Sequence, residues 1–216
     1  MIIDMRKFVF IAVLSLCAAS VFAQQEPMAK AALEKAVGMM KSSPVKIVFA
    51  TTIESASSKK KNNVSGTLVV MGNKFHLTMN GTEAYFDGKT QWVYVPESNE
   101  VTISTISARD QKQMNPLSVL SQYSGKDTKI MYSREANVSA NQVAIDLFPT
   151  SKSANEFRIL VKLDKRSNAP QMLQLYGRDG SKTTVVIKFF QKISADNKYF
   201  TFDLKAHPKV SVNDLR

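Results

Sequence analysis

Short segments in which apolar and polar side chains alternate follow one another through most of the chain, and they constrain the fold more than any other feature. A period of two is typical of β-strands, whose successive side chains point to opposite faces of a sheet. We predict a strand that ends at Phe86 and further strands at about residues 45–53, 66–71, 75–79, 90–95, 101–106, 129–133, 142–148, 157–163, 171–176 and 183–193. The sequence therefore predicts a mainly β (α+β) fold of about eleven antiparallel strands.

Two segments have a helical period instead. Apolar residues recur at spacings of three and four through residues 28–40, which predicts an amphipathic helix. Leu117, Leu120 and Tyr123 repeat the same spacing after Pro116, a residue that the first turn of a helix tolerates. We expect a curved, open half-barrel with these helices as a lid over an apolar concave cavity.

Several strands are apolar on both faces, although an antiparallel sheet usually leaves one face to water. In residues 90–95, Trp92 and Tyr94 fall on one face, and Val93 and Val95 fall on the other. Two interpretations stay open at this point. The concave side of the sheet encloses an apolar ligand, or the helices alone fill it.

The strand predicted at residues 183–193 has the same two-sided character. Simple alternation divides its apolar residues between the two faces, with one set formed by Val185, Ile187 and Phe189 and the other by Val186 and Phe190. We therefore expect Phe189 to point to the same face as Val185.

Residues 1–23 have the pattern of a secretory signal peptide. Arg6 and Lys7 begin a charged region, an apolar run follows, and Ala23 stands at the expected cleavage position. The apolar run is short compared with the roughly 20 residues of a membrane-spanning helix. We expect cleavage and export to the bacterial periplasm; an uncleaved anchor is the alternative.

Cys17 is the only cysteine of the chain, and it lies inside this segment. Leu16 stands where a lipid-attached protein has a small residue, so we do not expect lipidation. The mature chain would then contain no disulfide, no thiol nucleophile and no thiolate metal site. With no Pro- or Gly-rich linker to divide it, we expect residues 24–216 to form a single domain.

The formal net charge of +11 suits anionic membrane surfaces or acidic partners. The basic residues are scattered over predicted strands and loops, and no groove of aromatic and basic residues indicates nucleic-acid binding. We expect no nucleic-acid partner.

The residue types needed for catalysis or metal binding do not form a recognisable motif. The two histidines, His76 and His207, are far apart in the sequence. No zinc spacing, nucleophile elbow or phosphate-binding loop is present. We expect a protein that is not an enzyme and needs no cofactor or metal, although a chance pair of carboxylates stays open.

Three stretches together resemble the LolA family of periplasmic lipoprotein carriers. They read FDGKTQWVYVPESNEVTI, NPLSVLSQY and YFTFDLKAHPKVSVNDLR. The residues that match the family are Asp87, Gly88, Lys89, Trp92, Tyr94 and Pro96, then Pro116, Leu117 and Leu120, and finally Phe200, Phe202, Pro208, Val210, Val212 and Asp214.

The resemblance implies a monomeric carrier with a helical lid over an apolar cavity. Members of the family take triacylated lipoproteins from an ABC-type release complex in the inner membrane and transfer them to an outer-membrane receptor. The second apolar face would then line a place for acyl chains. A stress-sensing module of the same fold and a general lipid binder are the alternatives.

The candidate residues for the acyl-chain cavity and its lid are apolar: Phe49, Val69, Met71, Phe75, Leu77, Met79, Trp92, Leu117 and Leu120. One departure from the family concerns the lid. Where the family has an arginine that holds the lid closed, this chain has Met71 and Gly72. We therefore expect another polar contact to hold the lid, or a divergent relative.

Overall fold

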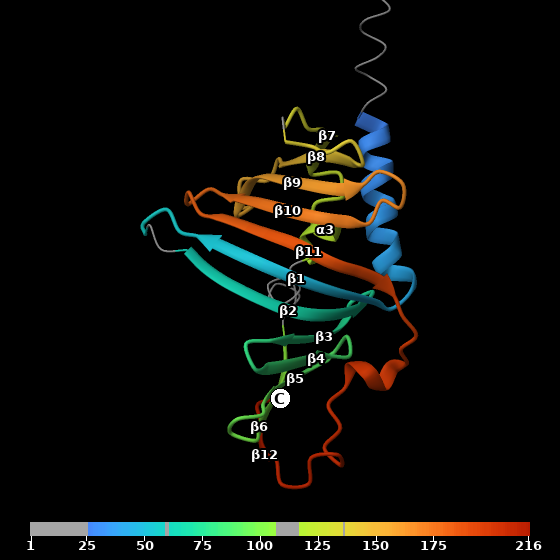
Figure 1. Cartoon of the computed structure of the whole chain (residues 1–216). Coiled ribbons are helices and arrows are strands. Elements are labelled where there is room, and N and C mark those ends of the chain that lie inside the picture. Colours follow the sequence, from blue (N-terminus) through green and yellow to red (C-terminus); the bar gives the residue numbers. More distant parts are fainter. Residues whose placement is uncertain (1–25, 59–60, 107–116, 136) are drawn as a thin grey trace, which may run out of the picture.

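The computed structural model describes residues 26–58, 61–106, 117–135 and 137–216. The predicted signal peptide and the predicted helix start at Pro116 lie outside these residues. In the described part of the chain, the strands form one open sheet in the order β12-β6-β5-β4-β3-β2-β1-β11-β10-β9-β8-β7 (Figure 1). The prediction of a mainly β, curved and open sheet is confirmed.

The strands are β1 (Val45–Glu54), β2 (Lys61–Met71), β3 (Lys74–Met79), β4 (Thr82–Phe86), β5 (Thr90–Val95), β6 (Glu100–Thr105), β7 (Thr128–Tyr132), β8 (Gln142–Pro149), β9 (Glu156–Asp164), β10 (Pro170–Gly177), β11 (Lys182–Lys192) and β12 (Ser211–Asp214). The helices among the described residues are the N-terminal helix (residues 26–42), the short α3 (Ser118–Gln122) and the 3-10 helix η1 (Asn197–Phe200).

The turn between β4 and β5 shows how local sequence sets the strand order. Gly88 has a φ of +103°, a conformation that glycine adopts without steric penalty. One carboxylate oxygen of Asp87 accepts hydrogen bonds from the backbone N–H groups of Lys89 and Thr90, both at 2.8 Å. These contacts reverse the chain and pair β4 with β5.

The N-terminal helix packs against one face of the sheet, which we call the inner face; the opposite face is the outer face. Its buried residues are Ala29, Leu33, Ala36, Val37 and Met40, at the spacing that the sequence predicts. They share one apolar core with β1 to β4, β7 to β11 and α3. The backbone N–H of Gly72 donates to the carbonyl of Met40 at 2.8 Å, which fixes the helix end to the turn after β2.

The alternation of β11 is interrupted, and the prediction for Phe189 is wrong. The register with β1 shifts so that Val48 faces Phe189 while the next residue, Phe49, faces Ile187, and Lys188 has no partner. This β-bulge reverses the faces beyond it. Ile187 and Phe190 therefore both pack on the inner core, whereas Phe189 is 43 % exposed.

The C-terminal segment, residues 193–216, covers the outer face of the β5–β6 end of the sheet (Figure 1). Phe202 packs there against Tyr94 and Val101, with Trp92 alongside. The segment ends in β12, which pairs with β6 in parallel. The residues between β11 and β12 return the chain from the middle of the sheet to its β6 edge.

Candidate functional site

The inner face of the sheet brings together six of the nine predicted site residues. Phe49 on β1 and the β3 residues Phe75, Leu77 and Met79 belong to the same apolar core as the α3 segment, which contributes Leu117 and Leu120. Gly66 lies under the ring of Phe49, where a Cβ atom would be 3.1 Å from the ring and 2.6 Å from the carbonyl oxygen of Thr78. Glycine therefore leaves room for this aromatic ring next to β2.

The other three predicted site residues lie on the outer face, opposite the core that holds the first six. Leu68 and Val70 belong to the inner core, so strand alternation turns Val69 and Met71 outward. Trp92 packs with the cluster of Tyr94, Val101 and Phe202. The two faces of β5 are therefore apolar for different reasons. The inner face packs on the main core, and the C-terminal segment covers the outer face.

Apolar contacts hold α3 on the inner face. The helix has five residues, and its N-cap, Leu117, makes no side-chain capping hydrogen bond. An isolated helix of this length is not stable in water. Leu117 and Leu120 are at most 1 % exposed, so burial of these side chains keeps the segment in place.

A polar contact joins the end of α3 to the sheet. The Tyr123 hydroxyl donates to a carboxylate oxygen of Glu156, at the start of β9, at 2.5 Å. Burial raises the pKa of the Tyr123 hydroxyl above its ordinary value, and the hydrogen bond to Glu156 raises it further. The hydroxyl therefore keeps its proton and stays a donor.

Sequence reasoning missed this contact. Tyr123 stands at helical spacing after Leu117 and Leu120, but its partner is 33 residues later. Only the spatial order of the strands brings Glu156 to the end of α3. The contact is a candidate for the polar interaction that the missing family arginine led us to expect.

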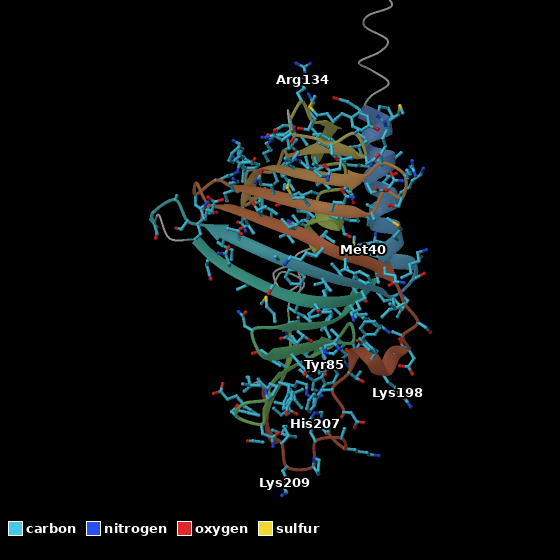
Figure 2. All side chains as sticks on the ribbon, in the orientation of Figure 1. Met40, Tyr85, Arg134, Lys198, His207 and Lys209 are labelled. Carbon is cyan, nitrogen blue, oxygen red and sulfur yellow. The ribbon has the colours of Figure 1, made fainter. Side chains whose placement is uncertain are left out.

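The two histidines lie on the outer face and are surrounded by aromatic rings. The ring of His76 stacks on Tyr85 at 4.0 Å, and its Nε2 lies 3.3 Å from a carboxylate oxygen of Glu83. Burial lowers the pKa of His76, and the nearby Glu83 opposes this effect only in part. The ring of His207 stacks on Phe202 at 4.4 Å. Figure 2 shows His207 in the C-terminal segment, away from the N-terminal helix.

Within the described ranges, no cluster of three His, Cys, Asp or Glu side chains could hold a metal ion. No helix in the same part of the chain is long and apolar enough to cross a membrane. What the inner face offers chemically is hydrocarbon contact from β1, β3 and the α3 segment.

Solved structures with similar folds come from several bacteria. An uncharacterized conserved protein from Thermus thermophilus has a TM-score of 0.55 and 10% sequence identity, with 87% of this chain and 99% of that chain covered. A LolA superfamily protein from Nitrosomonas europaea has a TM-score of 0.41 and 12% identity, with 81% and 98% covered.

A third similar structure is a putative outer membrane lipoprotein-sorting protein domain from Vibrio parahaemolyticus, with a TM-score of 0.41, 13% identity and coverage of 78% and 95%. No curated protein sequence matches the chain. A sequence model of one family, described as outer membrane lipoprotein carrier protein LolA, matches residues 19–180. The chain therefore belongs to the LolA family of outer membrane lipoprotein carrier proteins.

Proposed function

We propose that the protein binds the acyl chains of lipoproteins between the inner face of the sheet and the α3 segment, and carries them across the periplasm. The observation that carries this proposal is the part of the inner-face cover that α3 provides: a five-residue helix held by buried leucines and by the hydrogen bond from Tyr123 to Glu156. Such a cover can move without disrupting the sheet, because its own backbone adds little to the ladder of strands. Membership of the LolA family supports the same conclusion.

The energetics favour exchange of one apolar partner for another. An acyl chain that enters would take the place of Leu117 and Leu120 in the apolar core to which Phe75 and Leu77 also belong. Each buried methylene contributes roughly 0.8 kcal/mol, so one long acyl chain gains on the order of 10 kcal/mol relative to water. The leucines that it displaces lose about 1.5–3 kcal/mol each. The balance favours the loaded state and still permits release to a partner that binds the chain more tightly.

The rest of the proposal follows from the family. We propose a monomeric, non-catalytic carrier that acts after removal of residues 1–23, receives its cargo from an ABC-type inner-membrane complex and delivers it to an outer-membrane receptor. A stress-sensing or general lipid-binding role would use the same inner face, and these roles differ in what the protein carries when it is isolated.

The test compares two neighbouring α3 positions. The wild-type protein, Leu120→Glu and Ser121→Glu are purified from the periplasm, and bound molecules are identified by native mass spectrometry and lipid extraction. We expect lipoprotein with the wild type and with Ser121→Glu, because Ser121 is exposed, and little with Leu120→Glu. Only free phospholipid or fatty acid with the wild type would favour the general lipid binder and contradict the carrier.

A further inference from the structure

The outer face of β1, β11 and β10 carries an apolar patch that is open to solvent. Two of its residues on β11 are strongly exposed, Val186 at 44 % and Phe189 at 43 %. Three half-buried residues on the neighbouring strands complete what we call the outer patch: Val48, Ala50 and Met172.

The register of the sheet makes the patch continuous. Val48 lies opposite Phe189, and Ala50 lies opposite Val186 across the β1–β11 pair. Met172 lies opposite Val186 on the other side of β11. Directly opposed side chains lie on the same face and touch one another, so the five residues form one surface across three strands.

The bulge at Lys188 is what places Phe189 in this surface. Without the register shift, simple alternation would turn Phe189 inward and Phe190 outward. The C-terminal segment covers the outer face at the other half of the sheet, where Phe200 is fully buried. In the described part of the chain this cover lies over β3 to β6, and the exposed fractions of Val186 and Phe189 show that it leaves the outer patch open (Figure 1).

Two positive charges border the outer patch. Lys46 on β1 and Lys188 at the bulge are both exposed. The only acidic residue in β1, β10 and β11 is Glu54. Glu54 lies at the far end of β1. Its carboxylate oxygens form ion pairs with Nζ of Lys61 at 3.1 Å and Nζ of Lys182 at 3.5 Å.

We propose that the outer patch docks the protein reversibly on the surface of a bilayer that contains anionic phospholipid. Val186 and Phe189 would enter the boundary between headgroups and acyl chains, and Lys46 and Lys188 would contact the phosphates. Apolar residues with a rim of lysines are typical of surfaces that lie in the membrane interface. The net charge of +11 is spread over the chain, and an extended anionic surface attracts such a distribution more than a small acidic patch does.

The small size of the outer patch makes this docking weak and reversible. Two exposed apolar side chains bury much less apolar surface in a membrane than a lipid anchor does. A single myristoyl chain gives only marginal membrane binding, so the outer patch alone binds still more weakly. Weak docking would bring the protein to a membrane without keeping it there. The inference does not rest on the proposed carriage of acyl chains, because it uses the opposite face of the sheet.

The test measures binding of the mature protein to vesicles by flotation. Vesicles of phosphatidylcholine with phosphatidylglycerol are compared with vesicles of phosphatidylcholine alone. The variants are Phe189→Ser and Lys46→Glu. The controls are Leu204→Ser, which removes an apolar side chain with the same 43 % exposure, and Lys209→Glu, which makes the same change of charge at the far end of the molecule (Figure 2). Circular dichroism confirms that each variant is folded.

We expect binding to the anionic vesicles that high salt weakens. Phe189→Ser and Lys46→Glu should each reduce the partition coefficient by about fivefold or more, since one basic residue at an anionic surface contributes about 1 kcal/mol. Leu204→Ser and Lys209→Glu should leave it close to the wild-type value. The inner-face variant Leu120→Glu should also keep vesicle binding, which separates this proposal from the carrier function.

Three results would overturn the proposal. The wild type does not float with anionic vesicles, Phe189→Ser binds as well as the wild type, or Lys209→Glu lowers binding as much as Lys46→Glu. The last result would mean that net charge alone attracts the protein. Capture of an acidic protein through Phe189 in the absence of vesicle binding would assign the outer patch to a protein partner instead.

Discussion

At the scale of single residues, Tyr123 links the end of α3 to the sheet by a hydrogen bond. Its hydroxyl donates to Glu156, and the tyrosine itself is 6 % exposed. Because the raised pKa keeps the hydroxyl protonated, the hydroxyl remains a hydrogen-bond donor to Glu156 at neutral pH. If α3 moves away from the sheet, the hydrogen bond between Tyr123 and Glu156 must break, and the apolar contacts of Leu117 and Leu120 must be lost.

Tyr123→Phe tests this contact. Loss of a buried hydrogen bond reduces stability by about 1 kcal/mol, and we expect the loss to appear as local opening of α3. Amide hydrogen exchange of α3, for example at Leu120, should become about fivefold faster. Tyr132→Phe, a change of the same kind on β7, is the control. Equal exchange rates in Tyr123→Phe and the wild type would show that the hydrogen bond to Glu156 does not stabilise α3 on the sheet.

His76 gives the stability of the protein a pH dependence. Burial lowers its pKa below the value of 6.5 in an unfolded chain, although Glu83 attracts the protonated form and the rings of Tyr85 and Tyr199 surround it. Between the lowered pKa and 6.5 the unfolded state binds more protons than the folded state, so stability increases with pH in this window and is lost as the pH falls.

His76→Gln should flatten this dependence. The free energy of unfolding, measured by urea denaturation from about pH 5 to about pH 7.5, should rise less with pH in the variant than in the wild type. Any pH dependence from carboxylates would be common to both proteins. The same slope in both would contradict the assignment to His76.

At the scale of elements, the C-terminal segment stabilises the outer face with a few anchors. Phe202 is 6 % exposed and contacts the rings of Tyr94 and His207 at 4.9 and 4.4 Å. Val212 on β12 is 47 % exposed. The segment is therefore held mainly by the residues before β12, although β12 adds the last backbone pairing with β6.

Phe202→Ala and Val212→Ala form a matched pair for this claim. Loss of a buried phenylalanine costs about 3–5 kcal/mol in a closed core, and we expect a value near the lower end because this cluster is small. The exposed Val212→Ala should change stability by about 0.5 kcal/mol or less. Urea denaturation measures both. Similar effects of the two substitutions would mean that β12, and not the aromatic cluster, holds the segment.

Sequence patterns predict best those strands and helices that pack against elements close to them in the sequence. Alternation located most of the strands, and apolar spacing located the N-terminal helix and α3. The bulge at Lys188 was not predictable, since a single extra residue leaves no composition signal in a run such as VVIKFFQ. The parallel pairing of β12 was also missed, because its partner β6 is more than 100 residues earlier.

Sequence patterns predicted the face of a candidate site residue correctly where a strand or helix follows its regular period. They failed where the face is decided by contact with a segment distant in the sequence. Phe75, Leu77 and Met79 share a face by their period of two, and Leu117 and Leu120 share a helical face. Trp92 was misplaced because its cover, Phe202, comes from the end of the chain. The family motif includes Trp92, but the contacts of Trp92 make it part of the packing under the C-terminal segment.

At the scale of the whole molecule, the open sheet leaves two edges, and both edge strands are short. β7 has five residues and β12 has four. Short edges discourage pairing between copies, and a net charge of +11 makes copies repel one another. We expect sedimentation equilibrium to give the mass of a monomer over a wide range of concentrations; a concentration-dependent dimer would contradict this expectation.

The C-terminal segment also has a consequence for the order in which the chain folds. Its residues are distant in sequence from the strands that they cover, which belong to the first half of the chain. Until the segment docks, the indole of Trp92 and the ring of Tyr94 lack the ring of Phe202 as a packing partner on the outer face. Contacts between segments so far apart in sequence are slow to form, so we expect this end of the sheet to complete its packing late in folding.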